Sequence, residues 1–303
     1  MTDSVTILAC QIDVPPITTA EQREAHTDRV AHAIDTELAR GGPVDLVVLP
    51  ELGTLDYSRS CFDRIADLAE PLDASPTIDR LGRVAHRHGV PILAGMARLG
   101  AQSGLQSGTQ SGPQSGPRSE PAGQAFISQA LITAEGRLAA HYDKLHIAQF
   151  GDSTEKDYFT KGDHLLVFSA GGFTFGTIIC YDIRIPELSR TLARRHGVDV
   201  ILHPTAFCRD ETFHSWQAFA TTRAVENQVY FVSVNRAGAD FGESMLVEPW
   251  MDETVPLRRL STAEELARWT LSRARLDRAR ESYPFMDDAR HNYDALRTAP
   301  LVT

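Results

Sequence analysis

The sequence predicts an α/β protein in which helices cover β-sheets. Short apolar runs of strand length, such as residues 45–50, alternate with longer segments whose apolar residues recur every three or four positions. Helix start and stop signals, such as Gly89, separate the two kinds of segment. The order strand, helix, strand occurs in both halves of the chain, and this alternation is typical of a sheet covered by helices.

The first half of the chain has clear element boundaries. Residues 5–12 predict a core strand. Thr19 and Gln22 fit a capping box that starts the next helix, and a Gly-Gly-Pro run at 41–43 ends it. Pro76 starts another helix, because proline is favoured at the first helical position. Further strands are expected at residues 45–50, 90–94, 125–133 and 138–142.

The second half repeats the alternation too loosely to be a sequence repeat. Strands are expected at residues 175–179, 198–202 and 229–234, and helices at 186–195 and about 214–227. Residues 261–280 read by pattern as one long helix, with Ser261 and Glu264 as a capping box.

One segment has a different composition. Residues 101–116 contain Gln-Ser-Gly four times and few apolar side chains that folding could bury. We therefore expect a flexible loop at about 100–124, joining two strands within a single domain that spans residues 1–303. Loop closure depends weakly on length, so deletion of residues 102–116 is expected to leave stability nearly unchanged.

Composition excludes several classes of partner. The formal net charge of −10 argues against nucleic acid and against anionic membrane surfaces. The N-terminal residues do not form a signal peptide, and no apolar run is long enough to span a bilayer. The four cysteines are far apart, which disfavours a zinc knuckle or a redox dithiol. These observations predict a reduced, cytoplasmic protein without a metal site.

The strongest candidate for chemistry is Cys180. It stands where the strand predicted at 175–179 stops and a helical segment begins. A helix N-terminus nearby favours the thiolate, which is the reactive form of cysteine. Because free cysteine is more often a packing residue, the assignment depends on finding a base and a cation to accompany it.

Three charged residues can complete such a site. Glu51 follows a buried strand, where desolvation would raise its pKa toward that of a general base. Lys144 lies just past another strand among apolar neighbours, where it can stabilise an oxyanion and lower the pKa of a thiol. Glu155 is the third. Taken singly, each is more often a loop or surface charge than a catalytic group.

Taken together, these residues carry a family resemblance. Leu-Pro-Glu-Leu at 49–52, Tyr-Asp-Lys-Leu-His-Ile at 142–147 and Ile-Cys-Tyr-Asp-Ile-Arg at 179–184 resemble, in order, three signatures of the nitrilase (carbon–nitrogen hydrolase) superfamily. Tyr57 stands six residues after Glu51 and Glu155 stands seven residues before a glycine, as in that family. Segments 204–207 and 223–228 resemble later family blocks. The resemblance covers about residues 4–293.

The resemblance implies a four-layer αββα sandwich and a thiol mechanism without metal or cofactor. Glu51 would take the proton of Cys180, and the thiolate would attack an amide carbon. Lys144 and the Tyr181 N–H would hold the oxyanion, and Glu51 would pass its proton to the leaving amine. Water activated by Glu51 would then hydrolyse the thioester.

Other parts of the site follow from the same resemblance. Glu155 would orient Lys144 or the water. Tyr57, Tyr181 and Phe207 are candidate substrate-binding residues in the pocket wall. The family commonly pairs subunits through the helix after the nucleophile, which predicts a homodimer or higher homo-oligomer.

The residues after Cys180 favour an amide substrate. Family nitrilases usually have Cys-Trp-Glu, whereas this chain has Cys-Tyr-Asp-Ile-Arg at 180–184, similar to branches that include ω-amidase and deaminated-glutathione amidase. The predicted function is hydrolysis of a small-molecule amide to a carboxylic acid and ammonia or an amine. N-carbamoyl amide hydrolysis, nitrile hydrolysis, acyl transfer to an amine and a catalytically silent binding protein are the alternatives.

Several features depart from the family pattern or compete with it. Pro249 and Trp250 are followed by Met251 where the family usually has glycine, and the family makes the first part of 261–280 a strand, which we expect here too. A Cys–His hydrolase is the competing reading, but nothing in the spacing pairs a histidine with Cys180. The candidate histidines are His141, His146, His203 and His214, which are expected to be structural.

Overall fold

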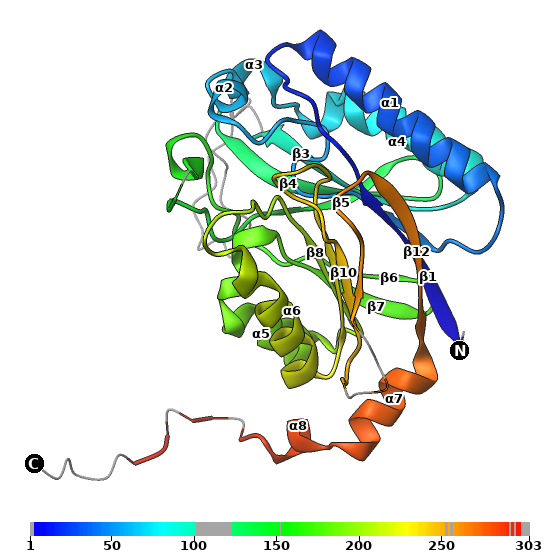
Figure 1. Ribbon diagram of the computed structural model, residues 1–303, viewed down its shortest axis with the longest axis vertical. Coiled ribbons are helices and arrows are strands. Elements are labelled where there is room, and N and C mark those ends of the chain that lie inside the picture. Colours follow the sequence, from blue (N-terminus) through cyan, green and yellow to red (C-terminus); the bar gives the residue numbers. More distant parts are fainter. Residues whose placement is uncertain are drawn as a thin grey trace, which may run out of the picture.

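Two β-sheets lie face to face between two layers of helices in the computed structural model (Figure 1). It describes residues 3–100, 123–151, 153–251, 254, 257–290, 292–293 and 295–297. The first sheet has the order β12 (Glu265–Ser272), β1 (Ser4–Gln11), β2 (Leu46–Val48), β3 (Ile92–Leu99), β4 (Ala125–Ile132) and β5 (Leu138–Asp143). The second has the order β11 (Arg258–Arg259), β10 (Met245–Val247), β9 (Tyr230–Val234), β8 (Val200–Pro204), β7 (Phe173–Thr177) and β6 (Val167–Ala170).

The strand directions are alike in the two sheets. In the first, β1, β2 and β3 are parallel, and antiparallel strands flank them. In the second, β7, β8 and β9 are parallel, again with antiparallel neighbours. Since the carboxyl ends of parallel strands are the usual place for function in such sheets, β2 and β7 present comparable positions for catalytic residues.

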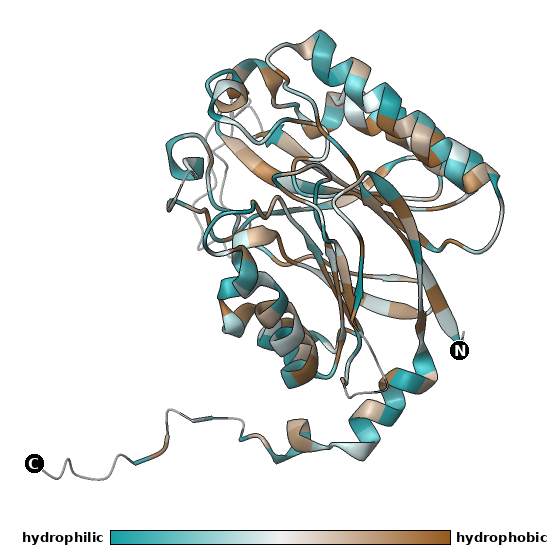
Figure 2. Ribbon diagram, viewed as in Figure 1, coloured by the Kyte–Doolittle hydropathy of each residue, from teal (hydrophilic) through white to brown (hydrophobic). Residues whose placement is uncertain are grey.

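Four helices form the outer layers. Helices α1 (Ala20–Ala39) and α4 (Pro76–His88) cover the first sheet, and α5 (Pro186–His196) and α6 (Phe213–Asn227) cover the second. A large apolar cluster that includes Ile7, Phe175 and Val232 fills the space between the sheets. In Figure 2, hydrophobic and hydrophilic residues alternate around α1, as expected for a helix with one buried face. The predicted αββα sandwich is confirmed.

Short elements occupy the connections and the C-terminal part of the chain. They are α2 (Arg59–Phe62), α3 (Ile65–Leu68), η1 (Leu72–Ala74), η2 (Glu155–Asp157), η3 (Cys180–Arg184), α7 (Arg273–Ser282) and α8 (Phe285–Asp288), where η marks a 3₁₀ helix. No helix in the described part of the chain combines the length and the apolarity that crossing a bilayer requires.

Local signals predicted the boundaries of α1 and α4. The Thr19 hydroxyl accepts a hydrogen bond from the Gln22 N–H at 3.3 Å, and the Gln22 side chain accepts one from the Thr19 N–H at 3.2 Å, which completes the capping box. Gly89 ends α4 in the left-handed conformation, with φ of 65°. The Gln-Ser-Gly segment at 101–116 lies outside the described residues, and the single-domain assignment stays a prediction.

The segment 261–280 is not one long helix. Its first part is strand β12, which pairs antiparallel with β1 along eight residues, and its second part is α7. Trp269 and Leu271 are both buried, which is the two-residue period of a strand. Glu264 does not cap a helix here, because its carboxylate accepts a hydrogen bond from the Asp13 N–H at 2.8 Å. The family-based expectation of a strand is confirmed.

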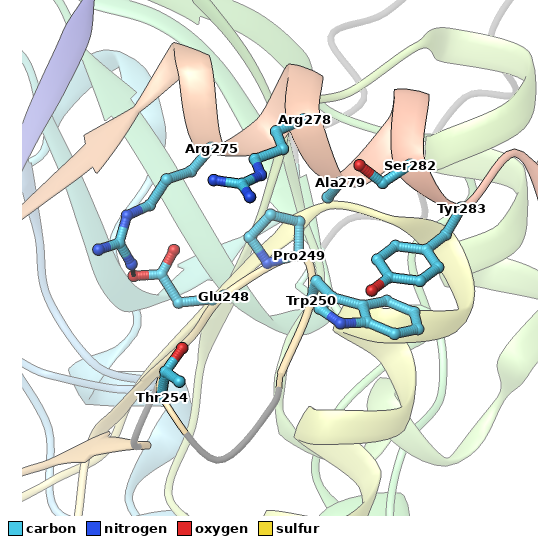
Figure 3. Close-up of a pocket in the computed structure, with 9 residues that line it drawn as sticks. All are labelled: Glu248, Pro249, Trp250, Thr254, Arg275, Arg278, Ala279, Ser282 and Tyr283. Atoms are coloured by element: carbon cyan, nitrogen blue, oxygen red, sulfur yellow. Dashed lines mark hydrogen bonds and ion pairs between the residues drawn. The ribbon is translucent and has the colours of Figure 1, made fainter.

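The late block that departs from the family pattern packs against α7. Trp250 stacks on Tyr283 with ring centroids 3.6 Å apart (Figure 3). Arg275 from α7 donates to Glu248 at 3.3 Å beside them. These residues line a surface cavity of about 320 Å³ whose lining includes none of Glu51, Lys144, Glu155 and Cys180. Glu248 and Trp250 therefore contact the C-terminal segment that contains α7, and the cavity they line shares no residue with the cavity at Cys180.

Candidate active site

The fold brings four predicted residues into one buried cluster. Glu51 follows β2, Lys144 follows β5, Glu155 begins η2 and Cys180 begins η3 after β7. The Lys144 Nζ lies 2.7 Å from Glu51 Oε1 and 2.7 Å from Glu155 Oε1. All three of these side chains are 0% exposed. The charge of Glu51 raises the pKa of the Cys180 thiol, so the nucleophile candidate and the base candidate lie close enough to interact.

Backbone donors complete the environment of the two carboxylates. Glu51 Oε2 accepts from the Ala206 N–H at 2.9 Å. Glu155 Oε2 accepts from the Ala148 N–H at 2.8 Å, and its Oε1 accepts from the Tyr57 hydroxyl at 2.5 Å. Three donors therefore fix Glu155 in place, which in turn fixes the ammonium of Lys144.

Two glycines allow the close approaches that bring these residues together. A Cβ on Gly95 of β3 would come within 1.8 Å of the Pro50 carbonyl oxygen, directly before Glu51. A Cβ on Gly162 would come within 2.3 Å of the Asp143 carbonyl oxygen, directly before Lys144. Both contacts are too short for any other residue, so these positions explain how three chain segments meet at one point.

Charge pairing sets the protonation of Glu51 and Lys144. Burial raises the pKa of Glu51 above its usual 4.5, and the charge of Glu155 adds to this, while Lys144 opposes it. Burial alone would lower the pKa of Lys144, but the carboxylates of Glu155 and Glu51 outweigh it and hold that pKa well above its usual value. Lys144 is thus a stable cation beside a carboxyl group that can take up a proton.

The resting thiol of Cys180 is protonated. Burial raises its pKa well above the usual value, the charge of Glu51 adds to the rise, and Lys144 lowers it. The expectation that a helix N-terminus favours the thiolate is wrong for this state: η3 is only five residues long and α5 begins later, at Pro186. The expected effect of Lys144 on the thiol has the predicted direction but does not dominate.

Asp182 links the second and third signature segments. Its Oδ2 accepts from the Tyr142 hydroxyl at 2.7 Å and from the Ile179 N–H at 2.9 Å. Its Oδ1 accepts from the His146 N–H at 2.9 Å and lies 2.7 Å from His146 Nδ1. This one buried carboxylate ties the turn that carries Lys144 to the turn that carries Cys180. Sequence analysis did not assign it a role, although its place two residues after the nucleophile was a signal.

A cavity of about 140 Å³ opens onto Cys180. Tyr57, Tyr181 and Phe207, the predicted pocket residues, all line it. Arg184 and Phe150 also line it, and neither was singled out from the sequence. The Arg184 guanidinium lies 5.1 to 5.9 Å from the ring centroids of four aromatic residues, namely Phe150, Tyr181, Phe207 and Phe219.

The histidines do not form a dyad with Cys180. His203 forms a hydrogen bond with Cys180, but its Nε2 lies 2.9 Å from the backbone carbonyl oxygen, so the bond is to the main chain and not to the thiol. His146 bonds Asp182, His141 lies 3.6 Å from Asp143, and His214 is exposed. Within the described ranges no hydrogen bond joins a histidine ring to the thiol, which agrees with the prediction that these residues are structural.

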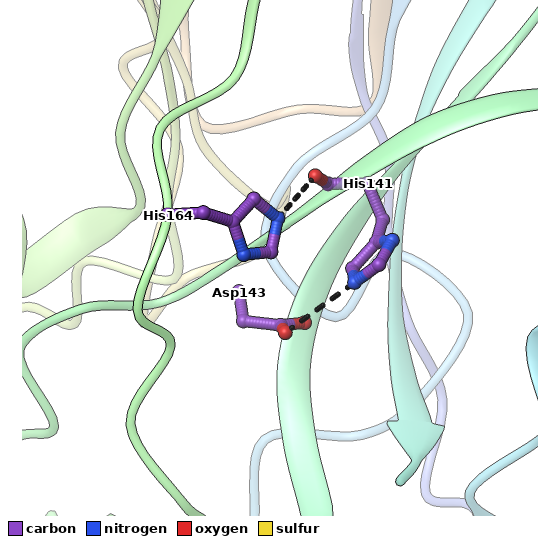
Figure 4. A group of neighbouring side chains, drawn as sticks. All are labelled: His141, Asp143 and His164. Atoms are coloured by element: carbon purple, nitrogen blue, oxygen red, sulfur yellow. Dashed lines mark hydrogen bonds and ion pairs between the residues drawn. The ribbon is translucent and has the colours of Figure 1, made fainter. Parts of the chain in front are cut away.

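Figure 4 shows a cluster with the composition of a metal site, formed by His141, Asp143 and His164. Arg98 already donates to both oxygens of Asp143, and the Ser128 hydroxyl donates to one of them as well. The Nε2 of His164 lies 2.9 Å from the His141 carbonyl oxygen. Because Arg98 already binds both oxygens of Asp143, we interpret the cluster as an ion-pair network that stabilises the end of β5.

Comparisons with known proteins agree with the geometry. A family model described as "Carbon-nitrogen hydrolase" matches residues 6–280. A 2-oxoglutaramate amidase from Bacillus subtilis is 27% identical over 251 residues, which cover 81% of this chain and 85% of that protein. The resemblance to the ω-amidase branch is thereby confirmed.

Two solved structures have the same architecture. Saccharomyces cerevisiae Nit3, described as a member of branch 10 of the nitrilase superfamily, aligns with a TM-score of 0.75 at 20% identity, covering 97% of each chain. A mutant amidase from Nesterenkonia sp. AN1 aligns with a TM-score of 0.68 at 25% identity, covering 94% of this chain and 97% of that one. That structure shows covalent addition of the acetamide moiety of fluoroacetamide at its active-site cysteine.

Proposed function

The chain belongs to the carbon–nitrogen hydrolase family, and on that premise we propose that it hydrolyses the C–N bond of a small-molecule amide through a thioester on Cys180. One observation carries the proposal: a buried lysine bridges two buried carboxylates at 2.7 Å each, and a thiol whose pKa is raised by one of them opens onto a cavity. This arrangement supplies a nucleophile, a base and a cation at one carbon.

The first half-reaction forms the thioester. Glu51 takes the proton of the Cys180 thiol while the sulfur attacks the amide carbon, so that the thiolate need not exist beforehand. The carbonyl oxygen becomes an oxyanion. Glu51 then gives the proton to the amide nitrogen, the C–N bond breaks, and ammonia or an amine leaves.

Two donors are suited to the oxyanion. The Lys144 ammonium has three N–H groups, and its bonds to Glu51 and Glu155 use two of them. The third remains for the substrate oxygen. Tyr181 is the second residue of η3, and the first N–H groups of a helix have no acceptor within it, so the Tyr181 N–H is suited to be the second donor.

The second half-reaction releases the acid. Glu51 takes a proton from water, the hydroxide oxygen attacks the thioester carbon, and the C–S bond breaks with return of the proton to sulfur. Glu155 keeps Lys144 in place through both halves, because it accepts hydrogen bonds from Tyr57, Ala148 and Lys144. The net reaction consumes one water and returns Cys180 as a thiol.

The cavity favours an amide whose acyl part carries an anionic group. Arg184 lines the cavity and donates to the Thr212 hydroxyl at 3.1 Å, but no carboxylate pairs with it among the described residues. A cation held over aromatic rings is suited to a carboxylate on the substrate. The 2-oxoglutaramate that names the Bacillus subtilis relative is an amide of this kind.

The test is ammonia release from a panel of neutral amides, mono-amides of dicarboxylic acids, carbamoyl compounds and nitriles, with intact-protein mass spectrometry for the acyl adduct. Cys180→Ala should lower turnover by at least about 10⁴-fold with an unchanged melting temperature, and Glu51→Gln should do the same. Cys10→Ala is the matched control, since Cys10 packs under α1 and should be dispensable. Comparable turnover by Cys180→Ala would exclude the mechanism.

The same panel tests the substrate class. Arg184→Met should raise KM for anionic amides by about 10-fold or more and leave neutral amides nearly unaffected, because it removes one charged hydrogen-bond partner. A preference for carbamoyl compounds or nitriles in the wild-type protein would favour the alternative family activities.

We also propose a cytoplasmic homo-oligomer. The four cysteines are free thiols, as expected in a reducing compartment. Large apolar side chains are exposed along the C-terminal part of the chain, including Tyr283, Phe285, Tyr293 and Leu296. In Figure 1 this part extends away from the sheets, where a second copy can cover it. A monomer in sedimentation at working concentrations would contradict the oligomer.

A further inference from the structure

A buried histidine holds the backbone of the nucleophile. His203 lies on β8 and is 0% exposed. Its Nε2 is 2.9 Å from the carbonyl oxygen of Cys180, which is 23 residues away in the sequence. The mechanism described above does not use this side chain.

The protonation of His203 follows from its neighbours. Burial lowers the pKa of the imidazole to about 4, so the ring is neutral near pH 7 and carries one N–H. A carbonyl oxygen can only accept, so the proton must be on Nε2, and Nδ1 must be an acceptor. The Ser233 hydroxyl, 2.7 Å from Nδ1, is then the donor to it.

A third residue fixes the hydroxyl. The indole Nε1 of Trp216 can only donate, and it lies 3.1 Å from the Ser233 oxygen. The donor order is therefore Trp216 to Ser233, Ser233 to His203, and His203 to the Cys180 carbonyl. The chain runs from α6 through β9 and β8 to η3, and every side chain in it is buried.

The carbonyl that accepts the last of these hydrogen bonds belongs to a residue with a strained backbone. Cys180 has φ of 43°, in the left-handed region that residues with a Cβ seldom adopt. The peptide bond after it is planar, so the Cys180 C=O and the Tyr181 N–H point in opposite directions. A bond that fixes the carbonyl therefore also fixes the N–H, which belongs to the second residue of η3 and so has no acceptor within that helix.

We infer that His203 is a positioning residue, whose hydrogen bond to the Cys180 carbonyl aims the Tyr181 N–H at the oxyanion. The inference rests on the proposed function, since it concerns the oxyanion of amide hydrolysis. The orientation of the oxyanion donor therefore depends on a series of hydrogen bonds between uncharged side chains, Trp216, Ser233 and His203, which we call the His203 relay.

The experiment separates donor orientation from thiol placement. Amide hydrolysis needs the oxyanion donor, whereas reaction with methyl methanethiosulfonate does not: the Cys180 sulfur attacks the methylthio sulfur, methanesulfinate leaves, and no carbonyl oxyanion forms. His203→Leu removes the donor at similar volume. His203→Gln keeps an amide N–H that can reach the carbonyl.

For His203→Leu we expect kcat to fall by about 100-fold, as for a displaced catalytic group, while KM changes by less than about 3-fold. The rate of Cys180 modification, read by peptide mass spectrometry, should stay within about 3-fold of wild type. His203→Gln should recover at least about 10-fold in kcat.

The matched control is His164→Leu. His164 makes a bond of the same kind, from an imidazole to a backbone carbonyl at 2.9 Å, but the carbonyl is that of His141 on β5 (Figure 4). That variant should keep kcat. If His203→Leu does not fold, Ser233→Ala is measured in its place, with an expected loss in kcat of about 3- to 10-fold and unchanged thiol modification.

Two results would overturn the inference. One is wild-type kcat in His203→Leu, or in Ser233→Ala where that variant takes its place. The other is a loss of kcat and of thiol modification in equal proportion, which would mean that His203 places the sulfur. A wild-type protein that is modified at Cys180 but hydrolyses no amide would overturn the proposed function, and the inference with it.

Discussion

Glu51 and Cys180 lie in comparable turns, here called corners, each of which follows a parallel strand of one sheet. Glu51 follows β2 of the first sheet, and Cys180 follows β7 of the second. Each corner contains a left-handed residue that is not glycine, Leu52 with φ of 45° and Cys180 with φ of 43°. In each, the carbonyl of that residue accepts a hydrogen bond of 2.9 Å from a buried side chain of another segment.

The two corners differ in the charge of the side chain that holds them. Arg236, which follows β9, reaches across to the first sheet and donates to the Leu52 and Leu55 carbonyls. Burial lowers its pKa, and Asp56 and Glu51 raise it, but an arginine stays charged. His203 holds the Cys180 corner from its own sheet, as a neutral ring.

This difference has a physical reason. A fixed positive charge near Glu51 favours the ionised carboxylate, which is the form that can accept a proton. The same charge beside Cys180 would alter the balance between thiol and carboxyl group on which proton transfer depends. At Glu51, the side chain that holds the backbone also supplies a positive charge that acts on the carboxylate. At Cys180, the side chain that holds the backbone is neutral, so it orients the peptide without adding a charge.

Arg236→Met is the sharpest test of this comparison. Glu51 must be ionised to act, so activity is lost as pH falls through its raised pKa, and the acid limb of kcat/KM should lie above the usual 4.5. Removing the cation raises that pKa further, which moves the limb to higher pH. Stability should fall by about 2 kcal/mol or more, because two buried carbonyls lose their donor.

The controls for this prediction separate charge from hydrogen bonding. Arg236→Lys keeps the charge but not the two-armed guanidinium, so stability should fall while the limb stays in place. His203→Leu should lower kcat without moving the limb. A pH profile of Arg236→Met that coincides with wild type would show that the corner holds Glu51 by geometry alone.

The sequence predicted the layers and the catalytic cluster for a local reason. Each of Glu51, Lys144 and Cys180 follows a strand, within a short signature that can be read without the rest of the chain. Arg236 and His203, whose side chains bond the backbone of the two corners, do not stand in a short signature of this kind. Arg236 is 184 residues from Leu52 and contacts it only because the sheets stack.

Two interpretations that rested on local pattern alone failed for the same reason, although the expectation of a strand in the first part of 261–280 was correct. Residues 265–272 have a helical pattern in isolation, but pairing with β1 makes them a strand. The helix N-terminus rule describes Cys180 by its neighbours in sequence, whereas burial and the charge of Glu51 decide its pKa. Both errors come from effects that arise only when distant segments pack.

Tyr57→Phe extends the comparison to Glu155. The Tyr57 hydroxyl donates to Glu155 at 2.5 Å, and its loss leaves a buried carboxylate with one partner fewer. We expect kcat to fall by about 10-fold, as for one hydrogen bond to a charged group. Tyr158→Phe is the control, because its hydroxyl donates to Asp63 near the surface, and it should keep full activity. Equal losses in the two variants would contradict a role for Tyr57 through Glu155.

The smallest expected effect concerns backbone strain. A left-handed residue with a Cβ costs about 1 kcal/mol relative to glycine, so Cys180→Gly should be more stable than Cys180→Ala by about that amount, although both lack the nucleophile. In thermal unfolding this corresponds to about 2–4 °C.

The same pair of substitutions can be made at the other corner. Leu52→Gly and Leu52→Ala both lose a fully buried side chain, at a cost of about 2–5 kcal/mol, and their difference again isolates the backbone. If the two differences agree, both corners carry the same strain and differ only in the side chains that hold them. A gain from glycine at Leu52 but not at Cys180 would mean that the His203 relay has made the left-handed conformation the relaxed one at the nucleophile.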